Sequence, residues 1–314
     1  HAALDAIGAT LDVFGGDRHN RAGKNAFCAG ADGMFVRWTE IDGAFLDAAH
    51  SVRAIVRYGV GYDNIDIDAA SARGVPVCNV QGYANHSVSD HALALMLACV
   101  RGLRIGIAPA FLRAQYASPP RPRLPELRNM TLGIIGLGRI GGTLCAKARG
   151  LFQRVLACDP YIPYERFERL GAIQCDFDAL LRESDIVSVH CNLTDETRRL
   201  IGRDALARMK PSAIVINTSR GPVVDEDALL DALQDERLYA AGLDCFWDEP
   251  PLANRDALLA HPHLVATGHY AWFSTEASRE LQRRAAENMV AMLRGEIPED
   301  CLNQAYGTVD NPNR

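Results

Sequence analysis

Residues 131–142, TLGIIGLGRIGG, give the clearest indication of the fold of this 314-residue chain. The apolar residues from Leu132 predict a buried strand, and Gly136, Gly138 and Gly141 follow it at once. Glycine permits a tight turn and a close approach of the backbone to a ligand, and the free N–H groups at a helix start attract phosphate. A glycine loop between a strand and a helix therefore indicates a dinucleotide-binding site.

An acidic residue at the end of the next predicted strand supports this interpretation. Asp159 lies 18 residues after Gly141, close to the offset of about 20 expected for the carboxylate that binds the adenosine ribose hydroxyls. This carboxylate would repel a 2′-phosphate, and residues 160–162 supply no arginine to compensate. The sequence therefore predicts NAD as the cofactor, in preference to NADP.

The composition is that of an ordinary globular protein, with 48% hydrophobic and 23% charged residues. At about 150 residues for a typical domain, the length predicts two domains or one large α/β unit. The net charge of -6 argues against a nucleic-acid partner. The longest apolar run, residues 92–100, is far shorter than the span of about 20 that crosses a bilayer. No signal-peptide pattern opens the sequence, so we expect no membrane partner and a cytoplasmic location.

The cysteines and histidines predict no metal site. Nine cysteines are scattered without a CxxC pair, which favours neither a disulfide framework nor a zinc site. His261 and His263 lie two residues apart, but no third ligand accompanies them at a suitable spacing. We expect these two histidines to lie in a solvated turn.

Short runs rich in Val and Ile alternate with amphipathic stretches, a pattern typical of βαβ units with parallel sheets. The first series predicts helices around residues 45–49 and 68–72 and strands at residues 10–14, 33–37, 54–58 and 75–80. The second series predicts a final helix at residues 275–293 and strands at residues 132–136, 155–159, 186–190, 213–217, 240–244 and 264–267. The fold class is therefore α/β.

Two segments separate the series. Residues 87–100 are apolar on most of a helical surface, which predicts a buried helix between the two domains. Residues 118–125 are rich in Pro and Arg and exclude a regular helix or a central strand. We interpret them as a stiff surface loop, with a polyproline ligand for a partner domain as the alternative.

Several longer stretches resemble the D-isomer-specific 2-hydroxyacid dehydrogenases. They are RYGVGYDNIDIDAASARGVPVCNV (57–80), LGIIGLGRIG (132–141), VSVHCNLTDETRRLIG (187–202), INTSRGPVVDEDAL (216–229), AGLDCFWDEP (241–250) and HYAWFSTEAS (269–278). Within the family, residues 269–272 and Arg57 are most similar to the branch of the C-terminal binding proteins.

The resemblance implies a particular division of the chain. A Rossmann-type doubly wound parallel sheet for the coenzyme would occupy residues 85–283. A smaller flavodoxin-like α/β substrate domain would be discontinuous, with residues 1–84 and 284–314. The resemblance also implies a homodimer and one short strand ahead of His1.

The chemistry of such an enzyme requires a cation for the substrate carboxylate and a proton donor for its carbonyl oxygen. Arg220 follows an apolar strand and has a guanidinium suited to the first task. His269 follows the last predicted strand, and Glu249 is a carboxylate that could orient its imidazole. Alone, an arginine at a strand end is more typical of a surface ion pair, and a loop histidine often has no special role. The resemblance assigns Arg220, Glu249 and His269 to catalysis.

The resemblance also assigns binding residues. The expected substrate contacts are Arg57, Val60, Gly61 and Trp272. The expected cofactor contacts are Gly136, Gly138, Arg139, Ile140, Gly141, Asp159, Cys191, Thr197, Thr218, Ser219 and Asp244. Three positions depart from the family pattern without removing a functional side chain. They are Gly268 and Gln81, where proline is usual, and Asn192, where proline or glycine is frequent.

The sequence therefore predicts an NAD-dependent oxidoreductase that interconverts a 2-keto acid and the (R)-2-hydroxy acid. One alternative is an NAD(H)-sensing binding protein of the corepressor kind with weak dehydrogenase activity. Another is a dehydrogenase for a different small anion, such as formate or phosphonate.

Overall fold

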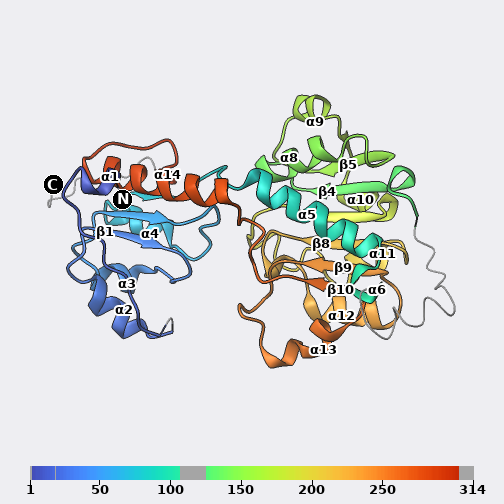
Figure 1. Cartoon of the computed structure of the whole chain (residues 1–314), viewed down its shortest axis with the longest axis horizontal. Helices are drawn as coiled ribbons and strands as arrows, with labels where there is room; N and C mark the ends of the chain where they lie inside the picture. The colour runs from blue at the N-terminus through green and yellow to red at the C-terminus, as the bar shows by residue number, and fades with distance from the viewer. Residues whose placement is uncertain (1, 18, 107–124, 304–314) are drawn as a thin grey trace. The chain divides into compact units, whose positions relative to one another are not determined.

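The computed structural model describes residues 2–17, 19–106 and 125–303 (Figure 1). The chain divides into two compact units. The small unit comprises His1–Tyr83 and Ser274–Arg314, and the large unit comprises Ala84–Phe273. The sequence places the second boundary ten residues later, at 283/284, inside helix α14 (Thr275–Leu293). A continuous helix belongs to one unit, so the division falls at Ser274, whose side chain caps α14.

The large unit is built on one parallel sheet, which has seven strands in the described residues. In chain order these are β4 (Thr131–Ile135), β5 (Arg154–Cys158), β6 (Ile173–Gln174), β7 (Ile186–Val189), β8 (Ile214–Asn217), β9 (Ala240–Leu243) and β10 (Leu264–Ala266). Their order across the sheet is β10-β9-β8-β7-β4-β5-β6. The chain adds strands to one side of β4 and then to the other, which confirms the doubly wound, Rossmann-type fold.

Helices cover both faces of this sheet, so its central strands are buried on both sides (Figure 1). One hydrophobic core lies under α10 (Phe177–Glu183), α11 (Arg203–Arg208), α12 (Glu226–Gln234) and α13 (Asp256–Ala260). The other lies under α5 (Asn85–Val100), α8 (Arg139–Ala148) and α9 (Tyr164–Leu170). Shorter elements are α6 (Leu103–Gly106) and the 3₁₀ turns η1 (Leu127–Asn129), η2 (Gly221–Val223) and η3 (Ala253–Arg255).

The small unit contains a parallel sheet of three strands in its described residues, in the order β1-β2-β3. These strands are β1 (Gly33–Val36), β2 (Ala54–Arg57) and β3 (Val77–Cys78). The helices are α1 (Ala2–Asp5), α2 (Arg21–Cys28), α3 (Gly43–Ala48), α4 (Ile67–Ala72) and α14. Phe45, Ile55 and Val77 are fully buried in its core, and α14 packs against β1 and β2.

Some sequence expectations differ from the structure. The strand predicted at residues 10–14 is wrong: this segment has no regular structure and pairs with no strand of the described residues, and Val13 is 81% exposed. Helix α2 and the two-residue strand β6 are not predicted. The apolar helix predicted at residues 87–100 is confirmed as α5, but its buried residues pack within the large unit, against α8, β8 and β9. Of the Pro-rich stretch 118–125, only Pro125 lies within the described residues.

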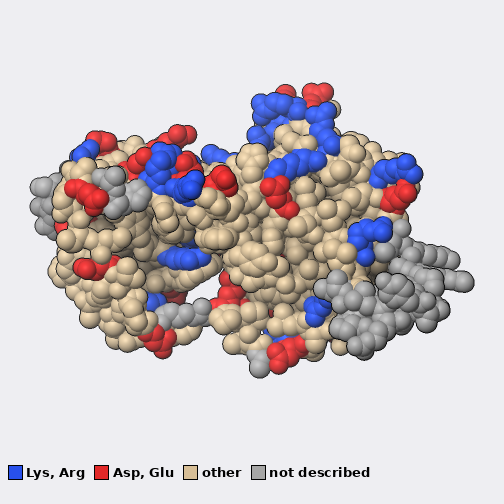
Figure 2. All heavy atoms as spheres, viewed as in Figure 1, with Lys and Arg blue, Asp and Glu red and all other residues tan. Residues whose placement is uncertain are grey.

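Charged side chains of both signs are mixed over the face of each unit in Figure 2. Many of them form ion pairs, such as Lys147 with Asp90 and Arg203 with Asp231. Among the helices that the structure describes, none is long and apolar enough to span a membrane.

Candidate active site

The predicted site residues of the large unit gather at one edge of its sheet. Because the strands are parallel, the loops that follow β4, β5, β7, β8, β9 and β10 all leave from their carboxyl ends. The order of the sheet reverses between β4 and β7, which is where ligands bind in open α/β sheets.

The glycine loop after β4 depends on the absence of side chains. Gly136 has φ +89°, and a Cβ there would lie 2.8 Å from the backbone nitrogen of Cys191. A Cβ at Gly141 would overlap the carbonyl oxygen of Gly136, so this glycine lets α8 start close to the strand. Gly138 precedes Arg139 and Ile140 at the start of α8 and faces open space. The loop therefore offers an uncovered helix start to a pyrophosphate.

Asp159 holds the backbone around this loop. One carboxylate oxygen accepts a hydrogen bond from the Leu137 N–H at 2.8 Å, and the other accepts one from the Tyr161 N–H at 3.0 Å. Arg166 of α9, which sequence reasoning missed, donates to the carbonyl oxygens of Leu137 and Gly138, each at 3.0 Å. Its guanidinium is therefore used by the protein rather than placed for a 2′-phosphate.

The segment after β7, with His190 and Cys191, lies beside the glycine loop and carries no charge at neutral pH. The His190 N–H donates to the Ile135 carbonyl at 2.8 Å, and its Nε2 lies 2.8 Å from Ser188 Oγ. Burial lowers the pKa of His190 to about 4, and burial raises the pKa of Cys191 to about 11. Both side chains are therefore neutral at neutral pH, which suits a site for an apolar ring.

The hydroxyls predicted to contact the cofactor differ in how they are used. Thr197 Oγ1 donates to the Asn192 carbonyl at 2.6 Å, and Ser219 Oγ donates to Asn217 Oδ1 at 2.8 Å. The buried Thr218 Oγ1 has no hydrogen-bond partner among the described residues. Since an unsatisfied buried hydroxyl is costly, a ligand with polar groups fits beside Thr218.

Arg220 is presented by a tightly built loop after β8. Buried Asn217 donates to the Arg220 carbonyl at 2.8 Å and accepts a bond from the Ser219 N–H at 3.0 Å. Arg220 Nη1 donates to the Ser219 carbonyl at 2.9 Å. A Cβ at Gly221 would overlap the Phe246 backbone, so the loops after β8 and β9 lie against each other.

His269 and Glu249 form a close pair. His269 Nδ1 lies 2.6 Å from Glu249 Oε2, and the other carboxylate oxygen accepts the Phe246 N–H at 3.2 Å. His269 has φ +53°, and its N–H donates to the Asp244 carbonyl at 2.6 Å. Trp272 donates its indole N–H to the His269 carbonyl at 3.2 Å. The imidazole is therefore held through its ring and through its backbone.

Asp244 supports the turn that carries His269. It is 1% exposed, and one oxygen accepts the Thr267 hydroxyl at 2.6 Å while the other accepts the Ala271 N–H at 2.9 Å. His91 Nε2 of α5 lies 2.9 Å from the Thr267 hydroxyl oxygen. No specific signal in the sequence points to His91, because Asp90 and other polar residues lie beside it in α5. The expected contact of Asp244 with the cofactor stays a prediction.

Glu226 supports the loop before Glu249 and was also missed. Its Oε1 accepts the Trp247 N–H at 2.6 Å, and its Oε2 lies 2.7 Å from Arg255 Nε. Burial raises the pKa of Glu226. This buried ion pair fixes the backbone from which Glu249 follows.

Two of the predicted catalytic residues act on the charge state of buried Cys245. Burial raises the pKa of this thiol, the nearby charge of Glu249 raises it further, and the charge of Arg220 lowers it. Arg220 and Glu249 therefore act on the same buried group, and His269 contacts Glu249. The structure brings Arg220, Glu249 and His269 to one end of the sheet.

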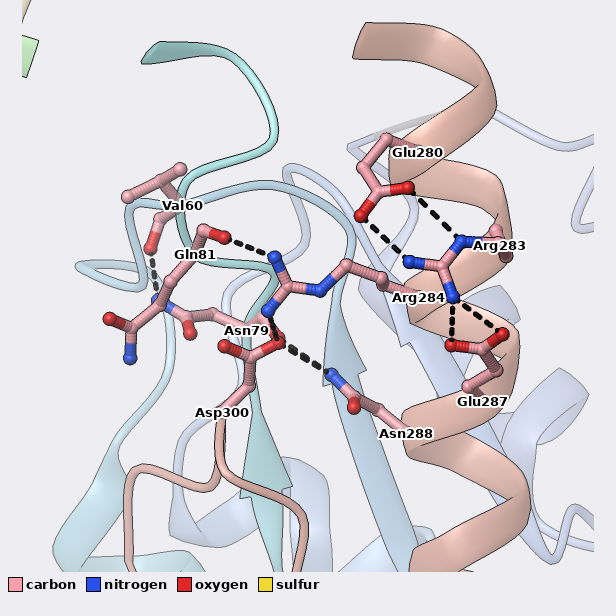
Figure 3. A network of polar contacts seen from close by, with 9 residues as sticks. All are labelled: Val60, Asn79, Gln81, Glu280, Arg283, Arg284, Glu287, Asn288 and Asp300. Carbon is pink, nitrogen blue, oxygen red and sulfur yellow. Dashed lines mark hydrogen bonds and ion pairs between the residues drawn. The ribbon is translucent and has the colours of Figure 1, made fainter. Parts of the chain in front are cut away.

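In the small unit, Arg57, Val60 and Gly61 lie at the end of β2 and just beyond it. Arg57 is 7% exposed, and its guanidinium carbon lies 5.7 Å from the ring centroid of Trp38. Asn79, after β3, donates to the Val60 carbonyl at 2.6 Å (Figure 3). The Asn79 bond fixes the backbone at Val60.

A metal centre has no counterpart in the described part of the chain, where no group of three or more His, Cys, Asp or Glu residues could hold an ion. The donor set at the sheet edge consists instead of glycine N–H groups, hydroxyls, one guanidinium and an imidazole–carboxylate pair.

Comparison with known proteins identifies the family. The family described as D-isomer specific 2-hydroxyacid dehydrogenase, NAD binding domain, matches residues 93–271, which is more than half of the chain. Glyoxylate reductase of Korarchaeum cryptofilum is 40% identical over 277 residues, covering 87% of this chain and 82% of that protein. D-3-phosphoglycerate dehydrogenase of Mycobacterium leprae is 38% identical over 314 residues. The match covers 98% of this chain but only 58% of the length of that dehydrogenase.

A solved structure supports the same family assignment. D-lactate dehydrogenase from Aquifex aeolicus, complexed with NAD and lactic acid, matches with a TM-score of 0.80 and 25% identity over 88% of each chain. The chain therefore belongs to the D-isomer-specific 2-hydroxyacid dehydrogenase family and contains the NAD-binding domain of that family.

Proposed function

We propose that this chain is an NAD-dependent oxidoreductase that interconverts a 2-keto acid and the (R)-2-hydroxy acid. The observation that carries the proposal is the 2.6 Å contact between His269 Nδ1 and Glu249 Oε2, beside the Arg220 loop. An imidazole held by a carboxylate is suited to exchange a proton with a substrate oxygen near neutral pH. The glycine loop lies at the same edge of the sheet.

The cofactor half of the site is assigned as follows. When bound, NADH supplies a hydride to C2 of the substrate. The N–H groups at the start of α8 would bind the pyrophosphate, and Asp159 would bind the adenosine ribose hydroxyls. Thr218 supplies its unsatisfied hydroxyl to the cofactor, and neutral Cys191 lines the site.

The substrate half uses charged side chains. The planar guanidinium of Arg220 binds the carboxylate and the carbonyl oxygen together. His269 donates its proton to that oxygen as the alcohol forms, and Glu249 holds the ring through Nδ1. We also propose Arg57, Val60, Gly61 and Trp272 as substrate contacts.

A small 2-keto acid is the favoured substrate class. The glyoxylate reductase is covered over 82% of its length, whereas the phosphoglycerate dehydrogenase extends well beyond the match. Glyoxylate, pyruvate and 3-phosphohydroxypyruvate are therefore the first three compounds to compare as substrates with NADH.

The test is the variant His269→Asn, assayed with this panel and NADH. We expect turnover to fall by roughly 10²–10⁴-fold, the usual contribution of a general acid, while NADH binding measured by fluorescence persists. His50→Asn, an exposed histidine in the small unit, is the control. Near-normal turnover of His269→Asn would remove the imidazole from the mechanism.

The same panel separates the alternatives. If the unmodified protein binds NADH tightly and reduces no keto acid, the proposal fails and a sensing role of the corepressor kind is favoured. If it oxidises only formate or a phosphorus oxyanion, the reaction class is different.

Cofactor choice gives a second test. The Asp159 carboxylate disfavours a 2′-phosphate, and the guanidinium of Arg166 is already bonded to loop carbonyls. We expect kcat/KM with NADH to exceed that with NADPH by roughly tenfold or more, which corresponds to about 1.4 kcal/mol. Equal efficiency with NADPH would contradict the role given to Asp159.

Three broader expectations complete the proposal. They are a homodimer, which light scattering would detect as twice the chain mass, a cytoplasmic location, and a place in the branch of the C-terminal binding proteins.

A further inference from the structure

Two free cysteines face each other in the small unit. Cys78 ends β3, and Cys301 lies opposite it in an antiparallel bridge from the C-terminal segment. The Leu302 N–H donates to the Val77 carbonyl at 2.8 Å, and the Asn79 N–H donates to the Asp300 carbonyl at 3.4 Å. These bonds flank the two cysteines, so the cysteines themselves occupy a non-hydrogen-bonded pair of the ladder.

This register suits a disulfide. In a non-hydrogen-bonded antiparallel pair the Cα atoms are about 4.5 Å apart and the side chains lie close together. Disulfides join residues whose Cα atoms are about 4.4–6.8 Å apart. The backbone therefore meets the requirement without a change of register.

Side chains fix the register on both sides of the pair. Asn303 accepts the Val77 N–H at 2.8 Å and donates to the Val75 carbonyl at 2.9 Å. On the other side, Asp300 accepts bonds from Arg284 and, at 3.1 Å, from Asn288 of α14 (Figure 3). Asn288 also donates to the Asn79 carbonyl at 3.1 Å. A slip of the segment would break these contacts, so the two sulfur atoms stay opposed.

The two thiols differ in reactivity. Cys78 is fully buried, with its Sγ 3.3 Å from the sulfur of Met292, whereas Cys301 is 6% exposed. Cys301 Sγ donates to Asn303 Oδ1 at 3.6 Å. The neighbouring Cys78 thiol lowers the pKa of Cys301. Because Cys301 is the more exposed of the two sulfur atoms and the thiolate is the reactive form, Cys301 is the sulfur that an oxidant meets first.

We propose that Cys78 and Cys301 are a redox-active pair that forms a reversible disulfide and covalently joins the two sequence segments of the small unit. With a hydroperoxide as oxidant, the Cys301 sulfur attacks the O–O bond, takes one oxygen as a sulfenic acid and releases water or an alcohol. The Cys78 sulfur then attacks the Cys301 sulfur, so that the S–S bond forms, the S–O bond breaks and water leaves. Two thiols are oxidised and one peroxide is reduced.

The consequence is mechanical and independent of the proposed dehydrogenase activity. Residues 1–83 and 274–314 form one unit although the large unit lies between them in the sequence. In the reduced protein their association rests on packing and hydrogen bonds. In the oxidised protein a covalent bond from β3 to the C-terminal segment maintains it.

Mass spectrometry of the full chain tests the proposal. The reduced protein is treated with hydrogen peroxide, denatured, alkylated with N-ethylmaleimide and digested. We expect nine alkylated cysteines before oxidation. After oxidation we expect two fewer, with a linked peptide that contains Cys78 and Cys301 and disappears on treatment with dithiothreitol.

Variants identify the pair. Cys301→Ser should abolish the linked peptide, and Cys175→Ser should retain it. Cys175 is the matched control because it belongs to a second pair of neighbouring cysteines. The register of β5 with β6, continued by one residue, places Cys175 beside Cys158. Cys301→Ser is preferred to Cys78→Ser because Cys78 is fully buried.

Several results would overturn the proposal. They are nine alkylated cysteines after oxidation, a link between Cys158 and Cys175 alone, a link only between two chains, or Cys301 over-oxidised without a link. A measurement without variants is the thermal midpoint of the wild-type chain, which should rise on oxidation and return with dithiothreitol. An unchanged or lower thermal midpoint in the linked protein would show that the disulfide does not stabilise the association of the two segments.

Discussion

The two halves of the carboxyl edge of the large sheet are built in different ways. Around β4, β5 and β7, glycines and backbone N–H groups face the proposed cofactor, and Asp159 holds the loop backbone. Around β8, β9 and β10, charged side chains face the proposed reaction, and buried groups such as Asn217, Asp244 and Glu226 hold their loops. Substitutions that add side-chain atoms should therefore disturb the first half most. Substitutions that remove a buried polar group should disturb the second half most.

The largest expected effect comes from the support of the reaction half. Glu226→Ala removes the buried acceptor of the Trp247 N–H and the buried partner of Arg255 Nε, while Arg255 Nη1 keeps its ion pair with Asp227, so the free energy of unfolding should fall by about 3 kcal/mol. Glu249→Gln should change stability far less while lowering turnover. Urea unfolding of both variants, with the keto-acid assay in parallel, checks this. If the two variants lost the same free energy of unfolding, Glu226 and Glu249 would not differ in role as proposed.

Added atoms in the glycine loop should have the next largest effect. Gly141→Ala places a Cβ onto the Gly136 carbonyl oxygen, and we expect a loss of up to about 3 kcal/mol in stability. Gly138→Ala meets open space, so the fold should remain and NADH affinity should drop. Thermal unfolding and NADH titration of the two variants give the comparison. A stable Gly141→Ala protein that binds NADH normally would contradict it.

The neutral segment after β7 in the cofactor half predicts a pH dependence. The unfolded chain protonates His190 near pH 6.5, whereas the folded protein does so only near pH 4. The unfolded state therefore binds more protons between these values, and stability falls as the pH is lowered. From pH 7 to pH 5 this amounts to about 2 kcal/mol. His190→Gln should remove that part of the loss in denaturant unfolding, and an identical pH profile for the variant would argue against a buried neutral histidine.

Local chemistry explains which features the sequence could predict. The glycine loop requires specific residues at fixed spacing, so Gly136, Gly141 and the fold around them could be predicted from the sequence. Arg220, Glu249 and His269 could be proposed only through the family resemblance, because a loop histidine or a strand-end arginine is ambiguous alone. Their gathering at one sheet edge is visible only in the structure.

The supporting residues could not be predicted, because their roles depend on which loops lie together in space. Glu226 supports Trp247 across 21 positions, and His91 reaches Thr267 across 176. The wrong strand at residues 10–14 has the same physical origin. Its apolar pattern resembles a strand, but among the described residues it pairs with no other strand. The Phe14 ring contacts Phe27 of α2, while the side chains of Leu11 and Val13 remain exposed.

The left-handed backbone at His269 limits which residues can replace it without distorting the turn. At φ +53°, histidine, asparagine and aspartate are tolerated, whereas valine, isoleucine and threonine would strain the chain. A substitution series at this position therefore separates into two experiments. Asparagine and aspartate report on the loss of the ring, while β-branched residues report on the cost of the conformation, whatever the chemistry of their side chains.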